Sequence, residues 1–226
     1  MSDVSDHRFA SHYATLSAAG WPALNEAAAF EIHVFASALA VGMTERDATG
    51  LTLRETTGLT DEELTRLMVR AFPLVQPASL IGEPGPDPLV DEEEALVRDL
   101  LVDHRADARP ATRFLAAIVA RRAMRDDHLW QDLGLANRSE LSRLLSTYFP
   151  RLAAGNTRNM RWKKYFYRTL CEAEGFSLCT APSCSVCSDF VSCFGEEDGM
   201  SRLATARRTI DGRRTLVGGA AITYAA

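Results

Sequence analysis

The sequence lacks the features that mark secreted, membrane-spanning or nucleic-acid-binding proteins. Residues 1–10 are polar and contain no apolar segment of the kind that directs secretion. The most apolar run, residues 27–43, is interrupted by Glu31 and His33, so we expect a buried helix there and not a membrane span. The formal net charge of -5 has the wrong sign for general binding to nucleic acids. We therefore expect a cytoplasmic protein that binds neither membranes nor nucleic acids.

The patterns of common enzymes and of β-sheets are also missing. No phosphate-binding glycine loop, Ser/His/Asp set or pair of catalytic carboxylates stands out, so we do not expect an enzyme. No segment sustains the alternation of apolar and polar residues that is typical of strands, which predicts an all-α fold. The 226 residues, 46% of them hydrophobic, are enough to bury a core in one domain or two small ones.

Amphipathic segments predict helices along most of the chain. Pro22 is expected in the first turn of the longest helix, which runs to about Met43, because a proline there loses no intrahelical hydrogen bond. Thr60 and Glu63 have the spacing of a capping box, in which each side chain bonds the backbone N–H of the other residue. The remaining helices are expected at residues 2–19, 61–72, 91–104, from 110 onwards, 137–149 and 156–175.

A proline- and glycine-rich segment, residues 76–90, divides the helical region and is expected to be a linker. The sequence repeats weakly on either side of it. Residues 58–73 match residues 134–150 with one residue inserted in the second copy, and a long predicted helix precedes each copy. We interpret residues 1–175 as a helical bundle of two related helical hairpin halves.

Four cysteines lie close together near the C-terminal end of the chain, in the pattern C-x4-C-x2-C-x5-C. The segment is too short and too polar to bury a core, so it needs a metal ion, a cluster or disulfides to fold. The chain has five cysteines, an odd number, which argues against a disulfide framework in a reducing compartment. The candidate ligands are Cys179, Cys184, Cys187 and Cys193.

The spacing of these thiols favours an iron–sulfur cluster over a single zinc ion. Structural zinc sites usually use two short Cys pairs separated by a longer stretch, whereas these four thiols occupy one compact loop. The corners of a cubane cluster are more widely spaced and suit such a loop better. A zinc ion and a redox-active disulfide pair remain alternatives.

Other candidate residues precede this segment. The helix expected at residues 156–175 has an apolar face and is otherwise basic, which is typical of a solvated surface but would also stabilise a nearby anionic cluster. Cys171, on the same helix, is expected to be a small buried residue and not a ligand. His128 is a further candidate ligand, although a lone histidine is more often a hydrogen-bonded structural residue, and His33 is a weaker candidate still.

Four stretches of the sequence together resemble a known family. They read HLWQDLGL at 128–135, YFPRLA at 148–153, MRWKKYFYR at 160–168, and the cysteine pattern followed by Phe-Gly at 179–195. With these stretches, residues 128–195 resemble the NifQ family of nitrogen-fixation proteins, and the helical region before them resembles it more loosely.

The resemblance implies an iron–sulfur protein that carries molybdenum in a Mo–Fe–S cluster and donates it for biosynthesis of the nitrogenase iron–molybdenum cofactor. It implies that Cys179, Cys184, Cys187 and Cys193 hold the Mo–Fe–S or 4Fe–4S cluster. The implied partners are molybdate, the NifEN scaffold and the NifH iron protein. A zinc-stabilised helical interaction module is the alternative.

The expected organisation follows from these assignments. A helical domain covers residues 1–175, a cysteine-rich cluster-binding loop covers 176–199, and a flexible tail covers 200–226, where the composition shows no stable helical pattern.

Overall fold

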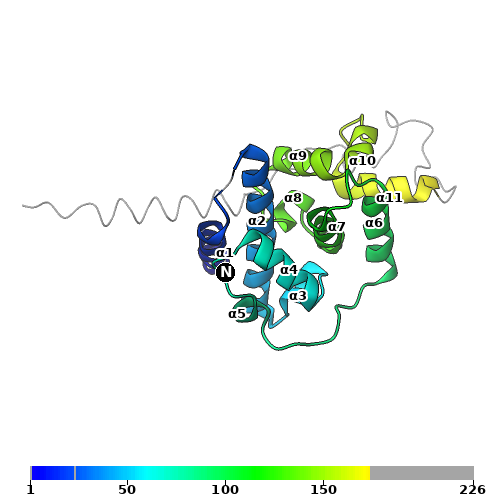
Figure 1. Cartoon of the computed structure of the whole chain (residues 1–226). Coiled ribbons are helices and arrows are strands. Elements are labelled where there is room, and N and C mark those ends of the chain that lie inside the picture. Colours follow the sequence, from blue (N-terminus) through cyan, green and yellow to red (C-terminus); the bar gives the residue numbers. More distant parts are fainter. Residues whose placement is uncertain (1, 23, 174–226) are drawn as a thin grey trace, which may run out of the picture.

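The computed structural model of the chain describes residues 2–22 and 24–173. Every regular element in this part of the chain is an α-helix, which confirms the prediction of an all-α fold (Figure 1). The loop predicted at 176–199 and the tail predicted at 200–226 lie outside the described residues, so the predictions made for them stay predictions.

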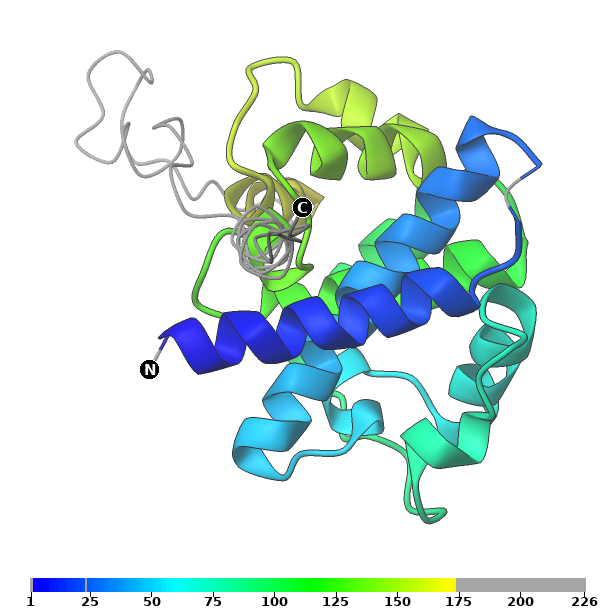
Figure 2. The ribbon, with the colours of Figure 1, turned by 90° about the vertical axis from the view of Figure 1, so that its left-hand side faces the viewer.

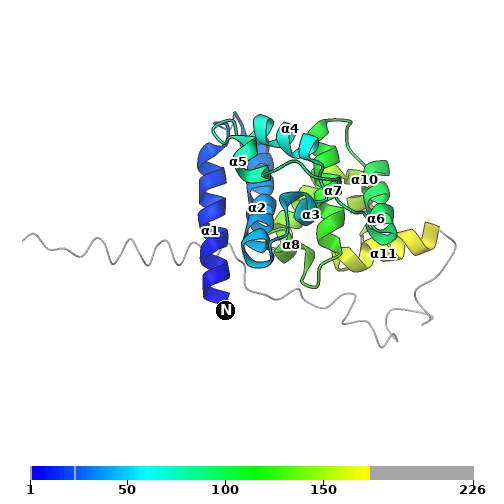
Figure 3. The same ribbon diagram turned by 90° about the horizontal axis from the view of Figure 1, so that it is seen from below.

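Helix α2 (Glu26–Thr49) is the longest helix of the described part, and α1 (Ser2–Ala19) packs against it, crossing it obliquely (Figures 2 and 3). The predicted start of α2 near Pro22 is wrong. The side chain of Asn25 accepts a hydrogen bond from the backbone N–H of the third residue after it at 2.9 Å, so the helix begins where an N-cap side chain is present. The helix is also longer than predicted, because it ends only at Gly50, which adopts φ 77°.

Among the described residues, α2 is the one helix that is long and apolar enough to cross a membrane. However, 67% of its most apolar window is buried inside the protein. The core helix of a soluble protein meets the same criteria, so this finding is weak evidence for a membrane span.

The two segments with similar sequences share their local conformation. Each copy is preceded by a short helix, α3 (Leu53–Thr57) before the first copy and α8 (Leu129–Asp132) before the second. A glycine with positive φ follows closely in both, with φ 72° at Gly58 and 69° at Gly134. The left-handed conformation costs glycine little, which explains why the glycine recurs in both copies.

The similarity continues through the next two helices. Helix α4 (Asp61–Ala71) and helix α9 (Arg138–Tyr148) both end at a phenylalanine, with φ -131° and ψ 63° at Phe72 and φ -134° and ψ 55° at Phe149. A proline and a further short helix follow each of them, α5 (Pro77–Ile81) after α4 and α10 (Pro150–Gly155) after α9. The prediction that the whole bundle consists of two related halves goes beyond these local matches and stays a prediction.

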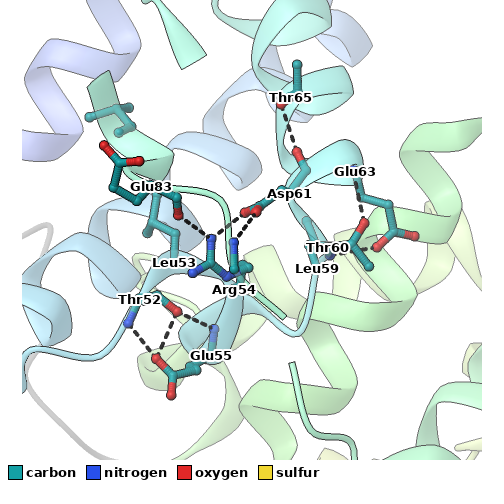
Figure 4. Close-up of polar contacts among 12 residues, drawn as sticks. Thr52, Leu53, Arg54, Glu55, Leu59, Thr60, Asp61, Glu63, Thr65 and Glu83 are labelled. Atoms are coloured by element: carbon teal, nitrogen blue, oxygen red, sulfur yellow. Dashed lines mark hydrogen bonds and ion pairs between the residues drawn. The ribbon is translucent and has the colours of Figure 1, made fainter. Parts of the chain in front are cut away.

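Helix α4 begins at the predicted capping box. The backbone N–H of Glu63 donates to Thr60 Oγ1 at 3.2 Å, and the backbone N–H of Thr60 donates to Glu63 Oε2 at 3.0 Å (Figure 4). A second capping box, formed by Thr52 and Glu55, starts α3 and was not predicted (Figure 4). Both boxes fix a helix start through bonds within four residues.

The segment predicted to be a linker, residues 76–90, contains helix α5 and is bonded to the helices around it. The buried side chain of Arg54 donates to the backbone oxygen of Glu83 at 3.1 Å (Figure 4). Arg121 Nη2 donates to the backbone oxygen of Leu89 at 2.6 Å. Arginines of the helical body therefore hold this segment in place.

Helix α7 (Pro110–Ala123) runs through the middle of the bundle, and most of its side chains are buried (Figure 1). Helix α6 (Glu92–Asp103) packs against it, and the predicted starts of both helices are confirmed. Helix α11 (Trp162–Ala173) packs against α6.

The predicted start of α11 at Asn156 is wrong. The Asn156 side chain accepts from the backbone N–H of Met160 at 2.8 Å and donates to the Met160 backbone oxygen at 2.9 Å, which closes a loop. Within that loop Asn159 has φ 54°, a left-handed conformation that no α-helix can contain. The helix therefore begins only after the loop.

Candidate metal centre and the helix that leads to it

The four predicted thiol ligands lie outside the described residues, so the structure assigns no geometry to them. Within the described part of the chain, no group of three or more His, Cys, Asp or Glu side chains is placed to hold a metal ion. The predicted metal chemistry therefore depends on Cys179, Cys184, Cys187 and Cys193. A set of four thiolates suits an iron–sulfur cluster and also suits zinc.

His128 is located at the start of α8. Its backbone N–H donates to the side-chain oxygen of Gln131 at 3.3 Å, and its side chain borders a cavity of about 190 Å³. The described structure assembles no metal-binding group around His128, and its role as a ligand stays a prediction. The cavity is also lined by two aspartates and three basic residues, which are Asp126, Asp127, Arg161, Lys163 and Lys164.

His33 has a structural role. The hydroxyl of Tyr13 lies 2.8 Å from its Nδ1, and Glu140 Oε2 lies 3.1 Å from its Nε2. Both ring nitrogens thus have a protein partner, and the imidazole links α1, α2 and α9. The sequence contained no signal for this link, because its members are far apart along the chain.

Cys171 is a free cysteine in α11 and is partly buried. The predicted apolar face of this helix is confirmed, since Trp162 and Phe166 are buried in the core and Leu170 packs against it. Helix α11 is therefore anchored in the helical body along this apolar face.

Lys163 is an exception to the solvated basic face that was predicted for α11. Its Nζ donates to Asp132 Oδ2 at 2.5 Å and also to the backbone oxygen of Arg125. Arg168, another basic residue of α11, donates through Nε to Glu172 Oε1 at 2.6 Å on the same helix. Lys163 thus ties the first turn of α11 to α8.

The carboxylate of Asp132 is almost completely buried, with 6% of the residue exposed. Burial raises the pKa of Asp132 above its ordinary value, although the hydrogen bond and the charge of Lys163 act in the opposite direction. The pair ties down the helix that precedes the cysteine segment in the sequence.

A model of the NifQ family matches residues 34–195, a range that contains most of the helical body and all four clustered cysteines. The chain belongs to the NifQ family. The resemblance seen in residues 128–195 is thereby confirmed, and the match extends into α2. Membership of the NifQ family supports a role in nitrogen fixation.

Individual NifQ proteins agree with this assignment. A "Protein NifQ homolog" from Sinorhizobium fredii (strain NBRC 101917 / NGR234) is 49% identical over 189 residues, which are 80% of this chain and 79% of the relative. "Protein NifQ" from Rhodobacter capsulatus is 45% identical over 50% of this chain and 62% of its own length. "Protein NifQ" from Azotobacter vinelandii is 49% identical over 47% of this chain and 54% of its own length. No solved structure matches the chain.

Replacing Lys163 with methionine is expected to destabilise this NifQ-family protein by about 2 kcal/mol at pH 7, because a buried carboxylate loses its counter-ion. Since the pKa of Asp132 is raised in the folded state, the destabilisation should be smaller at a pH below 7, because the carboxyl group takes up a proton more readily than an ordinary aspartate and the uncompensated charge is lost. Urea denaturation at both pH values measures the effect. Lys164→Met is the control, because Lys164 is the exposed neighbour, and a loss that does not change with pH would argue against the assigned pair.

Proposed function

We propose that this chain is an iron–sulfur protein that binds molybdenum in a Mo–Fe–S cluster and donates it for biosynthesis of the nitrogenase iron–molybdenum cofactor. The observation that carries the proposal is the pattern C-x4-C-x2-C-x5-C in a chain that belongs to the NifQ family. In this role the chain acts as a carrier of metal and not as an enzyme.

The ligands in this proposal are Cys179, Cys184, Cys187 and Cys193. Four thiolates hold a cubane of iron and sulfide, either as 4Fe–4S or with molybdenum at one corner. His128 is an additional candidate ligand. The helical body holds α11 through Trp162, Phe166 and the Lys163–Asp132 pair, and the segment that carries the cysteines follows this helix.

The proposed partners follow from the cargo. Molybdate is the form in which molybdenum reaches the protein, and the NifEN scaffold together with the NifH iron protein receives it. A carrier must release its metal to a partner, so the cluster should be accessible in the folded protein. The proposed location of the protein is the cytoplasm, because thiols stay reduced there and can bind the cluster.

Changing all four clustered cysteines to alanine is expected to abolish the binding of iron, sulfide and molybdenum, because the variant has no thiolate set to hold a cluster. The full chain and the variant are reconstituted anaerobically with iron and sulfide and are then incubated with molybdate. Visible absorption and metal analysis after desalting measure the bound cluster and the bound molybdenum.

Cys171→Ala is the matched control, because Cys171 is a free cysteine on α11 and is not one of the proposed ligands. This variant should retain the full cluster content. Equal molybdenum in the wild-type chain and in the variant without the four cysteines would rule out the proposal. One zinc ion per chain, with no sulfide and no colour, would instead support the zinc-stabilised interaction module.

A further inference from the structure

Three arginines from different elements converge on one cavity of about 310 Å³, which is also lined by residues at the start of α2. Arg70 lies in the last turn of α4, Arg109 precedes α7, and Arg143 belongs to α9. The single acidic residue among the described residues that line the cavity is Glu31. This local excess of cations contrasts with the net charge of -5 of the whole chain.

Glu31 receives its hydrogen bond from a neutral group. The Tyr148 hydroxyl donates to Glu31 Oε2 at 2.9 Å, while Arg70 Nη2 and Arg109 Nη1 each remain 3.6 Å from the carboxylate oxygens. Direct hydrogen bonds between a cation and a carboxylate are shorter, about 2.7–2.9 Å. Burial, and then the charge of Glu31, raise the pKa of Tyr148, which keeps the hydroxyl protonated as the donor. Glu31 therefore does not occupy the donors of the two guanidinium groups.

The other contacts of these arginines leave N–H donors at the cavity. Arg109 uses Nε to donate to Asp107 at 2.7 Å, which leaves its two terminal nitrogens. Arg143 lies over the ring of Phe30, 4.1 Å from the centroid, and pairs at 2.9 Å with Glu26. The side chain of Glu26 is 86% exposed, so water screens that charge strongly.

Arg70 makes its ion pair with Glu31 and no hydrogen bond within the described part of the chain. Its side chain is 49% exposed, as is that of Arg109, so a ligand from solution can reach both. The cavity is also lined by Asn25, the N-cap of the 24-residue helix α2, and the positive end of that helix dipole adds to the field of the arginines.

We propose that this cavity binds a tetrahedral oxyanion and that molybdate is the anion it takes. Guanidinium groups present planar pairs of N–H donors that match two oxygens of such an anion, and they are more weakly hydrated than ammonium groups. The choice of molybdate rests on the function proposed above, whereas the oxyanion site rests on the arginines alone. The site would hold molybdenum as its oxyanion, apart from the thiolates that hold it in a cluster.

The test uses the full chain with the four clustered cysteines changed to alanine, so that thiols cannot contribute to binding. Isothermal titration calorimetry with sodium molybdate at low ionic strength should show saturable binding. Arg70→Gln and Arg143→Gln should each weaken it about tenfold, which corresponds to the loss of a charge-assisted hydrogen bond. Circular dichroism verifies that every variant keeps its helix content.

Arg66→Gln is the matched control. Arg66 is on the same helix as Arg70, is exposed, pairs with Glu62 and does not line the cavity, so this variant should bind as tightly as the parent. Separate titrations with sulfate and phosphate report on the class of anion. If sulfate or phosphate binds to the parent chain and Arg70→Gln and Arg143→Gln weaken that binding, the result supports the oxyanion site.

Three outcomes would overturn the proposal. The site is refuted if no oxyanion binds, or if binding persists unchanged in the Arg70 and Arg143 variants. The assignment of molybdate is refuted if sulfate and phosphate bind and molybdate does not. Because the titrated chain has no cluster thiols, these results are independent of whether reconstitution confirms the proposed molybdenum cluster.

Discussion

Alanine in place of Gly134 is expected to lower the free energy of unfolding by about 3 kcal/mol. Part of the loss is conformational, since Gly134 has φ 69° and a left-handed backbone costs an L-residue about 1–2 kcal/mol. The larger part is steric. An added Cβ would lie 2.7 Å from Val41 Cγ2, 2.9 Å from Phe9 Cε2 and 3.0 Å from the backbone oxygen of Ser37. Forcing an extra carbon into such a packed site costs about 1–3 kcal/mol.

Gly50→Ala separates these two contributions. Gly50 has φ 77°, but no heavy atom lies within 4 Å of a Cβ placed there, so only the conformational loss of about 1 kcal/mol is expected. Urea denaturation of both variants measures the difference. Equal losses would show that the turn between α8 and α9 does not pack closely on α1 and α2.

Replacing Glu45 with glutamine is expected to cost about 3 kcal/mol, because it leaves the buried charge of Arg122 without its counter-ion. Arg122 is completely buried, and its Nη1 donates to Glu45 Oε1 at 2.6 Å. Its Nε and Nη2 have no hydrogen-bond partner among the described residues. Burial lowers the pKa of Arg122 and the charge of Glu45 opposes that change, so the carboxylate is what makes the buried cation tolerable.

A double variant provides the control for this prediction. Changing Arg122 to methionine together with Glu45→Gln removes the buried charge as well as its partner, so the double variant should be more stable than Glu45→Gln alone. Chemical denaturation of the wild type, both single variants and the double variant completes the cycle. Additive losses would mean that the two side chains do not interact.

The sequence alone predicts a structural feature correctly where that feature depends on residues close together along the chain. Thr60 and Glu63 start α4 as predicted, because a capping box is made within one helical turn. The predicted helix starts at Pro22 and Asn156 are wrong for an equally local reason. The side chain of Asn25 in the first case, and that of Asn156 itself in the second, forms a hydrogen bond with nearby backbone, and the helix begins only after it. Periodicity identifies a helix better than it identifies its first residue.

Contacts between distant residues were decided by the tertiary structure. His33 and Glu140 are 107 positions apart, and Lys163 and Asp132 are 31 apart, so no local pattern connects them. The cavity that contains Arg70, Arg109 and Arg143 exists because α4, α7 and α9 end or begin beside the start of α2. Packing of the helices alone determines which charged side chains meet.

The all-α fold, most of the helices and the family are predictable from the sequence, because they depend on periodicity, caps and motifs that lie along the chain. How the buried charges are paired and where the arginines gather depend on the tertiary structure. The physical reason is that these features require side chains from separate helices to come within a few ångströms of each other, and only the packed bundle sets those distances.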